Sequence, residues 1–359
     1  MKIGIVGLPN AGKSSLFSAL TGVAAEAANY PFTTVEPNVA IVGVPDARLD
    51  AVARTVGASK VVPDTIAFHD IAGLVEGAHR GEGLGNRFLA NIRETDAILH
   101  VVRAHTDERV VHPDGRVDPL ADIETIETEL VYADLEQAER RRERVVRAAR
   151  SGERRAVAEL DWLERLIEAL RAGRPARTVP APPEAPDAMA LLSPLTAKPV
   201  LFVANVDEGR AEVPDAVARH AEAVGARAVA VSARLEAELA ELDAEEAAAM
   251  RAELGLDESG LTAVVHAAFS LLDLVAFFTA GEAKPAQSWH LRRGLTAWHA
   301  AGLIHSDIQR GFVRAEVVSW DALVQAGGWA GARERAALRL EGRDYVVADG
   351  DVITVRFTP

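Results

Sequence analysis

A glycine-rich segment near the N-terminus constrains this chain more than any other feature. Residues 3–6 (Ile-Gly-Ile-Val) predict a strand, residues 7–14 have the pattern G-x-x-x-x-G-K-S, and residues 15–20 predict the start of a helix. A glycine-rich turn between a strand and a helix is the context of a phosphate-binding P-loop. Its backbone N–H groups and the positive end of the helix dipole both favour bound phosphate. We therefore expect an α/β nucleotide-binding domain with a predominantly parallel sheet.

The loop also supplies the side chains that phosphate chemistry requires. Lys13 would reach the β- and γ-phosphates and stabilise charge, and the Ser14 hydroxyl would bind Mg²⁺. Only five of the 39 basic residues are lysines, so composition does not explain a lysine here. A chance glycine turn would leave the agreement of strand, spacing, Lys and Ser unexplained. The predicted phosphate-binding residues are Asn10, Ala11, Gly12, Lys13, Ser14 and Ser15.

Two further segments have the composition of nucleotide-sensing loops. Residues 29–37 contain two prolines and two threonines, and Thr34 could complete the Mg²⁺ shell, although a plain surface turn has the same composition. A strand at residues 65–69 leads into Asp70-Ile-Ala-Gly73, a D-x-x-G pattern. Asp70 would hold Mg²⁺ through water, and the Gly73 N–H would bond the γ-phosphate. The glycines that follow suit a switch, or alternatively a passive flexible loop.

The water-activating group is not where Ras-type GTPases carry it. Leu74 occupies the position of the glutamine that orients water in those enzymes, and leucine cannot do so. His112, in a turn-rich loop at residues 110–115, is a candidate because imidazole exchanges protons near neutrality. The alternative is a solvated loop histidine.

The base-reading segment departs from the guanine pattern N-K-x-D. A strand at residues 200–204 ends in Asn205-Val206-Asp207-Glu208, with Val206 in place of the lysine and Glu208 in place of the aspartate. Because adenine presents an acceptor at N1 and a donor at N6, adenine is at least as well suited to this loop. Ser232 follows the last predicted strand of the domain, in a loop expected to pack against the base.

Between these motifs lies a predicted helical hairpin, with helices over residues 122–150 and 153–171. Residues 139–155 contain eight arginines and three glutamates, which suits either a solvated helix end or a contact for RNA phosphate. Seven prolines at residues 175–199 indicate a linker. Residues 276–359 predict a small α+β domain with strands at 288–291, 313–320, 345–347 and 352–357 and a hairpin turn at 348–350.

Composition restricts the kinds of site the chain can contain and the location we expect for it. The chain has no cysteine, so we exclude disulfides and thiolate sites. Its net charge is −14, so we expect any polyanionic partner to bind only at a locally basic part of the surface. The first strand begins at residue 3 and no apolar run reaches membrane-spanning length. We expect a cytoplasmic protein without a membrane partner, and a monomer.

Taken in order, these motifs resemble the YchF / Obg-like ATPase family, a branch of the translation-factor-related P-loop GTPases. The resemblance covers nearly the whole chain and includes G-L-P-N-A-G-K-S-S, N-Y-P-F-T-T-V-E-P-N, D-I-A-G-L-V, N-V-D-E, F-F-T-A-G and D-Y-V-V-A-D-G-D-V. It implies a nucleotide-binding G domain at residues 1–120 and 196–275, a coiled-coil hairpin with its linker at 121–195, and a TGS domain of the β-grasp type at 276–359.

The resemblance also implies function. It implies ATP preferred over GTP, with the base contacted by the segment that contains Asn205, Val206 and Glu208. His112 matches the histidine that replaces the catalytic glutamine, and Asn10 matches an asparagine that helps to bind K⁺ in related enzymes. The implied partners are the ribosome, with its large subunit and rRNA contacted by the hairpin and the TGS domain. Thr33 stands where some members carry a regulatory cysteine, so thiol-based regulation is not expected.

Three alternatives remain open from the sequence. One is a GTPase of the same architecture. Another is a nucleotide-gated ribosome- or RNA-binding module whose hydrolysis is incidental. A small-molecule kinase is less favoured because no acceptor or lid signature accompanies the P-loop.

Overall fold

The computed structural model describes residues 1–26, 38–71, 84–107, 117–256 and 259–358. The chain forms two compact units. The first contains Met1–Val42 and Ala67–Leu271, and the second contains Gly43–Ile66 and Leu272–Pro359. Both units are therefore built from segments that are separated in the sequence.

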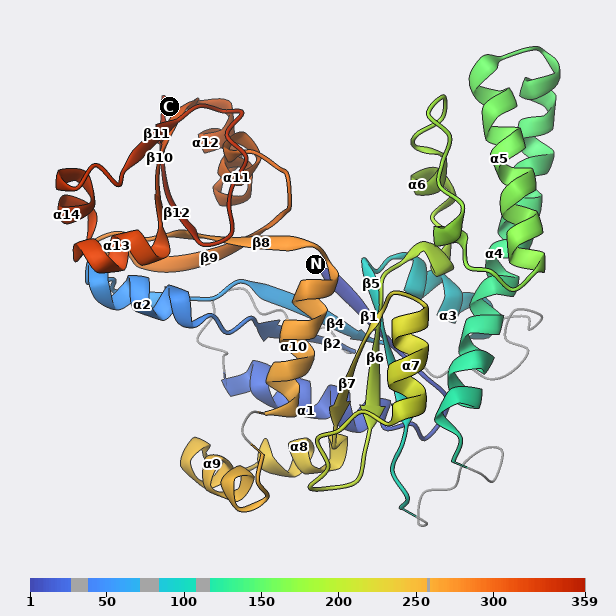
Figure 1. Cartoon of the computed structure of the whole chain (residues 1–359), viewed down its shortest axis with the longest axis horizontal. Helices are drawn as coiled ribbons and strands as arrows, with labels where there is room; N and C mark the ends of the chain where they lie inside the picture. Colours follow the sequence, from blue (N-terminus) through green and yellow to red (C-terminus); the bar gives the residue numbers. More distant parts are fainter. Residues whose placement is uncertain (27–37, 72–83, 108–116, 257–258, 359) are drawn as a thin grey trace. The chain divides into compact units, whose positions relative to one another are not determined.

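The first unit is built on a six-stranded sheet with the order β2-β4-β1-β5-β6-β7 (Figure 1). Strand β1 pairs in parallel with β4 and β5, β5 with β6, and β6 with β7. All seven residues of β5 are buried, as expected for a central strand of a parallel sheet. The strands are β1 (Lys2–Val6), β2 (Val39–Gly43), β4 (Thr65–Asp70), β5 (Ala97–Arg103), β6 (Val200–Asn205) and β7 (Arg227–Val231). The predicted α/β architecture is confirmed.

Along the chain, the helices of this unit either connect two of its strands or follow the last one. Helix α1 starts at Lys13, directly after the glycine-rich turn that follows β1. The others are α3 (Leu84–Arg93), α7 (Asp215–Ala223), α8 (Ala233–Leu239), α9 (Ala244–Glu253) and α10 (Gly260–Leu271), and α1 itself spans Lys13–Glu26. Ser232 caps α8, since its hydroxyl accepts from the Leu235 N–H.

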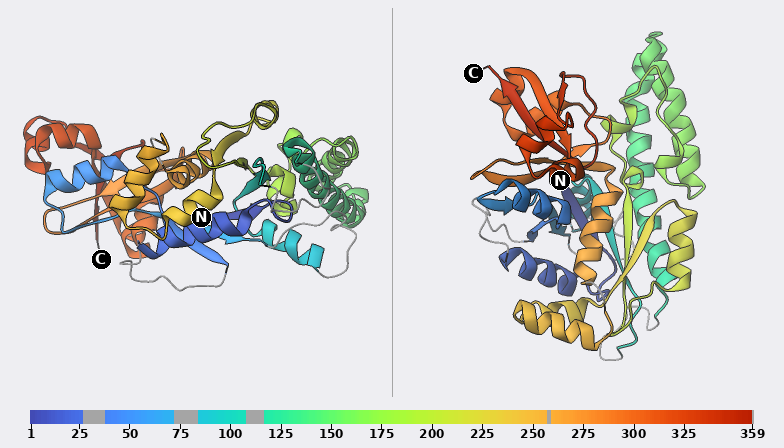
Figure 2. Two further views of the ribbon diagram at one scale, coloured as in Figure 1. Left: turned by 90° about the horizontal axis from the view of Figure 1, so that it is seen from below. Right: turned by 60° about the vertical axis from the view of Figure 1, so that its left-hand side comes forward.

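The inserted hairpin consists of α4 (Pro119–Arg150) and α5 (Arg154–Arg171), which lie side by side in both views (Figure 2). An apolar core centred on the fully buried Trp162 holds the two helices and the following linker together. The Trp162 indole Nε1 donates to the Val179 carbonyl at 3.0 Å. The linker adds η1 (Ala176–Thr178), α6 (Ala188–Leu192) and η2 (Leu195–Ala197).

The second unit contains a six-stranded sheet with the order β11-β10-β12-β8-β9-β3. Its strands are β3 (Lys60–Val62), β8 (Leu274–Thr279), β9 (Pro285–Arg292), β10 (Phe312–Ser319), β11 (Arg339–Glu341) and β12 (Asp351–Phe357). Its helices are α2 (Ala47–Val56), α11 (Ala297–Ile304), α12 (Ser306–Arg310), α13 (Trp320–Ala326) and α14 (Trp329–Glu334). Three predicted strands of this region overlap β9, β10 and β12.

The predicted strand at residues 345–347 is wrong. Among the described residues, Val346 forms only an isolated bridge with Thr296. The strands that pair with β10 are β12 and β11, and β11 lies before this segment in the sequence. The turn at residues 348–350 therefore precedes β12 without closing a hairpin. Its carboxylate, Asp349, instead accepts from the Ala276 N–H at 2.8 Å.

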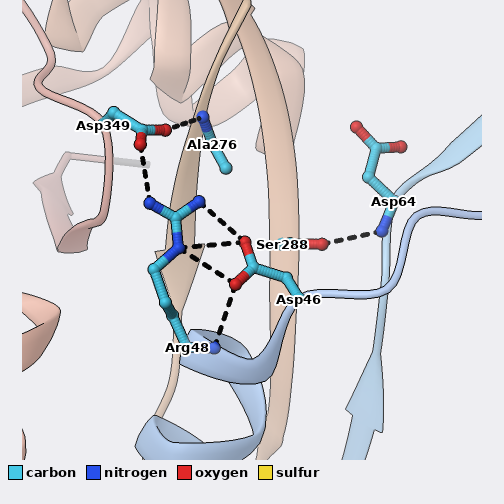
Figure 3. Close-up of polar contacts among 6 residues, drawn as sticks. All are labelled: Asp46, Arg48, Asp64, Ala276, Ser288 and Asp349. Carbon is cyan, nitrogen blue, oxygen red and sulfur yellow. Dashed lines mark hydrogen bonds and ion pairs between the residues drawn. The ribbon is translucent and has the colours of Figure 1, made fainter. Parts of the chain in front are cut away.

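Residues 43–66 are placed differently from the predicted boundaries, which gave residues 1–120 to the nucleotide-binding domain. In the structure they cluster with the C-terminal residues. Strand β3 pairs in parallel with β9, and α2 packs on α13 and β9. Arg48 forms ion pairs with Asp46 at 2.8 Å and with Asp349 at 2.6 Å (Figure 3). The Asp64 N–H donates to the Ser288 hydroxyl at 2.7 Å.

Candidate functional site

The glycine-rich turn is held tightly by its neighbours. A Cβ at Gly7 would lie 2.4 Å from the Val101 carbonyl oxygen, and a Cβ at Gly12 would lie 2.1 Å from Asn205 Nδ2. Neither approach is possible for a side chain, so glycine is required at both positions. Asn10 adopts a left-handed backbone conformation with φ of 62°, which asparagine tolerates better than most residues.

Asn205 connects this turn to the loop after β7. Its Nδ2 donates to the Ala11 carbonyl at 3.0 Å, and its Oδ1 accepts from the Ala233 N–H at 3.0 Å. Because both ends of the amide are engaged with backbone, Asn205 fixes two walls of the site relative to each other. The sequence alone indicated a base contact for this residue.

Lys13 lies at the start of α1 and is 8% exposed. Its Nζ donates to the Leu8 carbonyl at 2.7 Å, so the ammonium group is directed back over the glycine-rich turn. Burial lowers the pKa of Lys13, while the Asp70 carboxylate opposes that shift. Burial also raises the pKa of Asp70, and Lys13 opposes this second shift. The charges of Lys13 and Asp70 therefore act on each other across the turn.

A cavity of about 660 Å³ opens above the turn. That volume is suited to a nucleotide. Nine residues proposed from the sequence line it, namely Asn10, Gly12, Lys13, Ser14, Ser15, Asn205, Val206, Glu208 and Ser232.

Five proposed residues are placed elsewhere or not described. Ala11 does not line the cavity, because its side chain is buried and its carbonyl accepts from Asn205. Asp70 ends β4 without lining the cavity, although it acts electrostatically on Lys13. Thr34, Gly73 and His112 lie outside the described residues.

The remaining wall contains residues that sequence reasoning missed. His105, Thr106 and Asp107 follow β5, while Asp207 follows β6 and Arg234 lies in α8. All five residues come soon after the carboxyl end of a strand. Ligands of parallel α/β sheets bind at these ends, so this position in the sequence could have identified them. Burial lowers the pKa of His105, with the Arg103 charge acting in the same direction, so its ring is uncharged near neutrality.

Both acidic side chains of the base-reading segment are already engaged. The Asp207 Oδ1 accepts from the Thr106 N–H at 3.0 Å, and its Oδ2 accepts from the Thr106 hydroxyl at 3.1 Å. Glu208 lies 3.3 Å from the Arg234 guanidinium. Each carboxylate of this segment therefore already has a protein partner within the described structure.

Comparisons with known proteins agree with this geometry. A family model described as "50S ribosome-binding GTPase" matches residues 2–135, and the C-terminal model of YchF GTPases, described as a protein of unknown function, matches residues 274–358. The "Ribosome-binding ATPase YchF" of Bacillus subtilis (strain 168) is 48% identical over 99% of this chain and 98% of its own length. The chain belongs to the YchF family. It is accordingly a P-loop nucleoside triphosphatase, and the resemblance seen in the motifs is confirmed.

Other members and neighbours extend the comparison. The Escherichia coli O157:H7 protein with the same description is 46% identical over 99% of both chains. The solved structure of the Schizosaccharomyces pombe YchF GTPase has a TM-score of 0.88 and 32% identity, covering 99% of this chain and 97% of that one. A GTP-binding protein from Pyrococcus horikoshii OT3, at a TM-score of 0.64 and 20% identity, shares the fold.

Two features are absent from the part of the chain that the structure describes. None of the described helices is both long and apolar enough to cross a bilayer. The described residues also contain no group of three or more His, Asp or Glu side chains that could hold a metal. A P-loop Mg²⁺ site does not need such a group, because the nucleotide phosphates and a hydroxyl provide most of the ligands.

Proposed function

We propose that this YchF protein hydrolyses ATP to ADP and phosphate in an Mg²⁺-dependent reaction and prefers ATP to GTP. The observation that carries the preference is the engagement of Asp207 by Thr106 and of Glu208 by Arg234. Guanine would have to share Asp207 with Thr106 or Glu208 with Arg234, whereas adenine needs no carboxylate. Val206 adds no charge that would support a guanine contact.

The cavity residues fit this reaction. Lys13 is buried beneath the cavity and close enough to Asp70 for their charges to interact. In the proposal Lys13 and the turn stabilise charge on the phosphates, Ser14, Thr34 and Asp70 hold Mg²⁺, and Gly73 binds the γ-phosphate. The metal, when bound, neutralises developing phosphate charge. His112 orients water in place of the glutamine that Leu74 replaces, and Asn10 assists a K⁺ ion.

We also propose a ribosome-associated, cytoplasmic switch that acts as a monomer. The curated relatives are described as ribosome-binding ATPases, and one matching model is described as a 50S ribosome-binding GTPase. The arginine-rich hairpin and the C-terminal TGS domain are the proposed contacts with the large subunit and its rRNA. Within the described structure, Arg144, Arg147, Arg150 and Arg154 of the hairpin have no acidic partner, whereas Arg141 is paired with Glu159. Unpaired arginines at a helix tip are suited to phosphate contacts.

The deciding experiment is a competition of ATP and GTP, with Mg²⁺, against a fluorescent nucleotide. We expect ATP to bind at least about tenfold more tightly, equivalent to about 1.4 kcal/mol. A matched double variant, Val206→Lys with Glu208→Asp, restores N-K-x-D and is expected to move the preference toward GTP. Tighter binding of GTP by the unmodified protein would establish the GTPase alternative.

A second experiment separates an enzyme from a nucleotide-gated binding module. His112→Ala is expected to lower the rate of ATP hydrolysis by at least about a hundredfold, the usual contribution of a general acid or base. ATP affinity should change little. If the variant retains ribosome co-sedimentation and cellular function without hydrolysis, the binding-module alternative holds. Replacing K⁺ with Na⁺ in the same assay tests the proposed ion at Asn10.

A further inference from the structure

Arg234 is a cationic side chain of the nucleotide cavity that none of the sequence motifs accounts for. It lies in α8, which follows β7 directly in the first unit (Figure 1). Hydrogen bonds on either side of it fix the start of that helix. The Ala233 N–H donates to the Asn205 side chain, and the Leu235 N–H donates to the Ser232 hydroxyl. The Arg234 side chain is consequently presented to the cavity from a fixed backbone position.

Three carboxylates surround the Arg234 guanidinium, and each comes from a different segment. Glu238 lies one turn further along α8, with its Oε1 2.9 Å from Arg234 Nε. Glu208 follows β6, with its Oε1 3.3 Å from the same Nε. Asp107 follows β5, with its Oδ2 3.7 Å from Arg234 Nη1. Glu208 and Asp107 line the cavity with Arg234, whereas Glu238 is not among its described lining residues.

These distances indicate that two carboxylates compete for one donor. Arg234 Nε carries a single hydrogen, and Glu238 accepts it at the shorter distance. Glu208 is therefore attracted mainly by charge, and neutralising Glu238 would release the Nε–H to Glu208. About half of each side chain is exposed, so the contribution of each pair is modest and depends on the other charges of the network.

The position of Glu208 makes this competition relevant to the choice of base. Glu208 stands where N-K-x-D has its aspartate, the carboxylate that accepts from the N1–H and the 2-amino group of guanine. A carboxylate attracted by a guanidinium is a poorer acceptor for a base. Adenine does not present this pair of donors, so it loses nothing. The Arg234–Glu208 pair is therefore an element directed against the competing ligand.

We propose that Arg234 is a specificity-determining residue whose hold on Glu208 sets the ratio of ATP affinity to GTP affinity. The inference rests on the proposed nucleotide function and adds a residue outside the base-reading segment. Glu238 draws the guanidinium away from Glu208, so it weakens the selectivity that Arg234 creates. Asp107 lies farther from the guanidinium, and its contribution is smaller.

The test is a competition of ATP, GTP and ITP against a fluorescent nucleotide, with Mg²⁺ and the full-length protein. Arg234→Gln, Glu238→Gln and Arg234→Lys are the test variants. Arg293→Gln is the matched control, because Arg293 is similarly exposed, pairs with Asp273 at 2.9 Å and belongs to the second unit. The quantity compared is the ratio of ATP affinity to GTP affinity in each protein.

We expect Arg234→Gln to shift this ratio toward GTP by roughly threefold to fivefold, the upper range for an exposed ion pair. Glu238→Gln should shift it toward ATP by a smaller factor. Arg234→Lys keeps the charge and should keep most of the ATP preference, and the control should leave the ratio unchanged. ITP presents the N1–H without the 2-amino group, so Arg234→Gln should improve GTP binding more than ITP binding.

Salt provides a readout that a purely structural role would not change. ATP and GTP carry the same charge, so salt affects their affinities alike unless an ion pair distinguishes them. Raising the salt concentration screens an exposed pair. The ratio should therefore move toward GTP in the unmodified protein and stay constant in Arg234→Gln.

Equal losses of ATP and GTP affinity in Arg234→Gln would assign Arg234 a general contact with nucleotide and overturn the proposal. A shift toward GTP in Glu238→Gln would also overturn it, because Glu238 would then support the hold on Glu208. The unmodified protein tests the proposed function separately. If it prefers GTP and Arg234→Gln increases that preference, the ATPase assignment fails and this inference stands. If it prefers ATP and Arg234→Gln leaves the ratio unchanged, the inference fails and the assignment stands.

Discussion

At the scale of single residues, Asn205 shows how one amide organises the nucleotide site. Its two hydrogen bonds connect the glycine-rich turn at Ala11 with the start of α8 at Ala233, and both are buried. The absence of a side chain at Gly12 leaves the space that the amide fills. Because one donor and one acceptor of the Asn205 amide are already engaged with backbone, we expect base specificity to come mainly from other residues.

This division of roles predicts the behaviour of Asn205→Ala. Removing the amide leaves the Ala11 carbonyl and the Ala233 N–H unpaired, which costs roughly 1–3 kcal/mol for each buried group. ATP and GTP affinities should both fall, by about the same factor of ten or more, in the competition assay. The Val206→Lys, Glu208→Asp variant should instead change their ratio. A change of ratio in Asn205→Ala would show that this residue reads the base.

His100 is a second residue with a measurable consequence. It is 2% exposed on β5, beside the Phe202 ring, and burial lowers its pKa to about 3, with smaller contributions from the His220 and Lys13 charges. In the unfolded chain a histidine titrates near 6.5. Below that pH the unfolded chain takes up a proton that the folded chain does not, so acidification lowers the free energy of unfolding by up to about 1.4 kcal/mol per pH unit.

The matching prediction concerns His100→Leu. This variant removes the titrating group, so its free energy of unfolding should decline less steeply between about pH 6 and pH 4.5 than that of the unmodified protein. Urea denaturation at several pH values measures both slopes. Parallel slopes for the two proteins would mean that His100 is protonated in the folded chain.

The role of a residue was predictable from the sequence where the spacing of neighbouring residues forms a recognisable motif. The turn that ends in Lys13 and Ser14 is such a case, since four features within fifteen residues agree. His105 was not predictable, because a single histidine after a strand carries no local signature. The pairing of Asp207 with Thr106 was also hidden, since the two residues lie 101 positions apart and meet only because β5 and β6 are neighbours.

At the scale of elements, the hairpin depends on a buried carboxylate at its root. Asp134 on α4 is fully buried and accepts from the Leu195 N–H, the Thr196 N–H and the Thr196 hydroxyl, at 2.7 to 2.8 Å. These bonds fix η2, and with it the returning linker, against α4. Burial raises the pKa of Asp134, while the three donors oppose the shift.

Asp134→Ala should therefore loosen the hairpin root. Two backbone N–H groups and a hydroxyl would lose their acceptor, so we expect a loss of about 3 kcal/mol or more. Thermal unfolding followed by circular dichroism measures the effect. Glu143→Ala, on an exposed part of the same helix, is the control and should change stability by less than about 0.5 kcal/mol. Equal melting temperatures for the two variants would contradict a structural role for Asp134.

Elements were predictable when one period continued over many residues. The apolar stripes of α4 and α5 predicted both helices to within three residues at each end. Three-residue strands offer no such period. The sequence analysis did not predict strand β3, and it placed a strand at residues 345–347 where the structure has β11 at an earlier position. Pairing across the sheet decides which short extended segment becomes a strand.

At the scale of the whole molecule, the sequence did not predict that residues 43–66 belong to the same compact unit as the C-terminal residues. Arg48 and Asp349 are 301 positions apart, and Asp64 accepts from the His290 N–H across 226 positions. The family model of the C-terminal domain matches residues 274–358, whereas the compact unit also contains residues 43–66. That segment follows β2 and precedes β4, the strands next to the two predicted nucleotide-sensing segments. The chain therefore leads from each of these segments directly into the second unit.

The second unit should consequently depend on a segment far from it in sequence. A fragment of residues 272–359 lacks β3 and the buried face of α2, formed by Leu49, Val52, Ala53 and Val56. A fully buried leucine or valine contributes about 1.5–3 kcal/mol, and a small domain has little stability to lose. The fragment alone should melt without cooperativity.

A peptide of residues 43–66 added in trans should restore a cooperative transition, measured by circular dichroism and by dispersed amide signals in NMR. The peptide with Arg48→Ala and Asp64→Ala is the matched control, because it keeps the apolar face and loses the ion pair to Asp349 and the carboxylate that accepts from the His290 N–H. It should restore folding only at higher peptide concentration. A fragment that folds cooperatively by itself, with a stability unchanged by either peptide, would show that residues 43–66 are attached to this unit without supporting it.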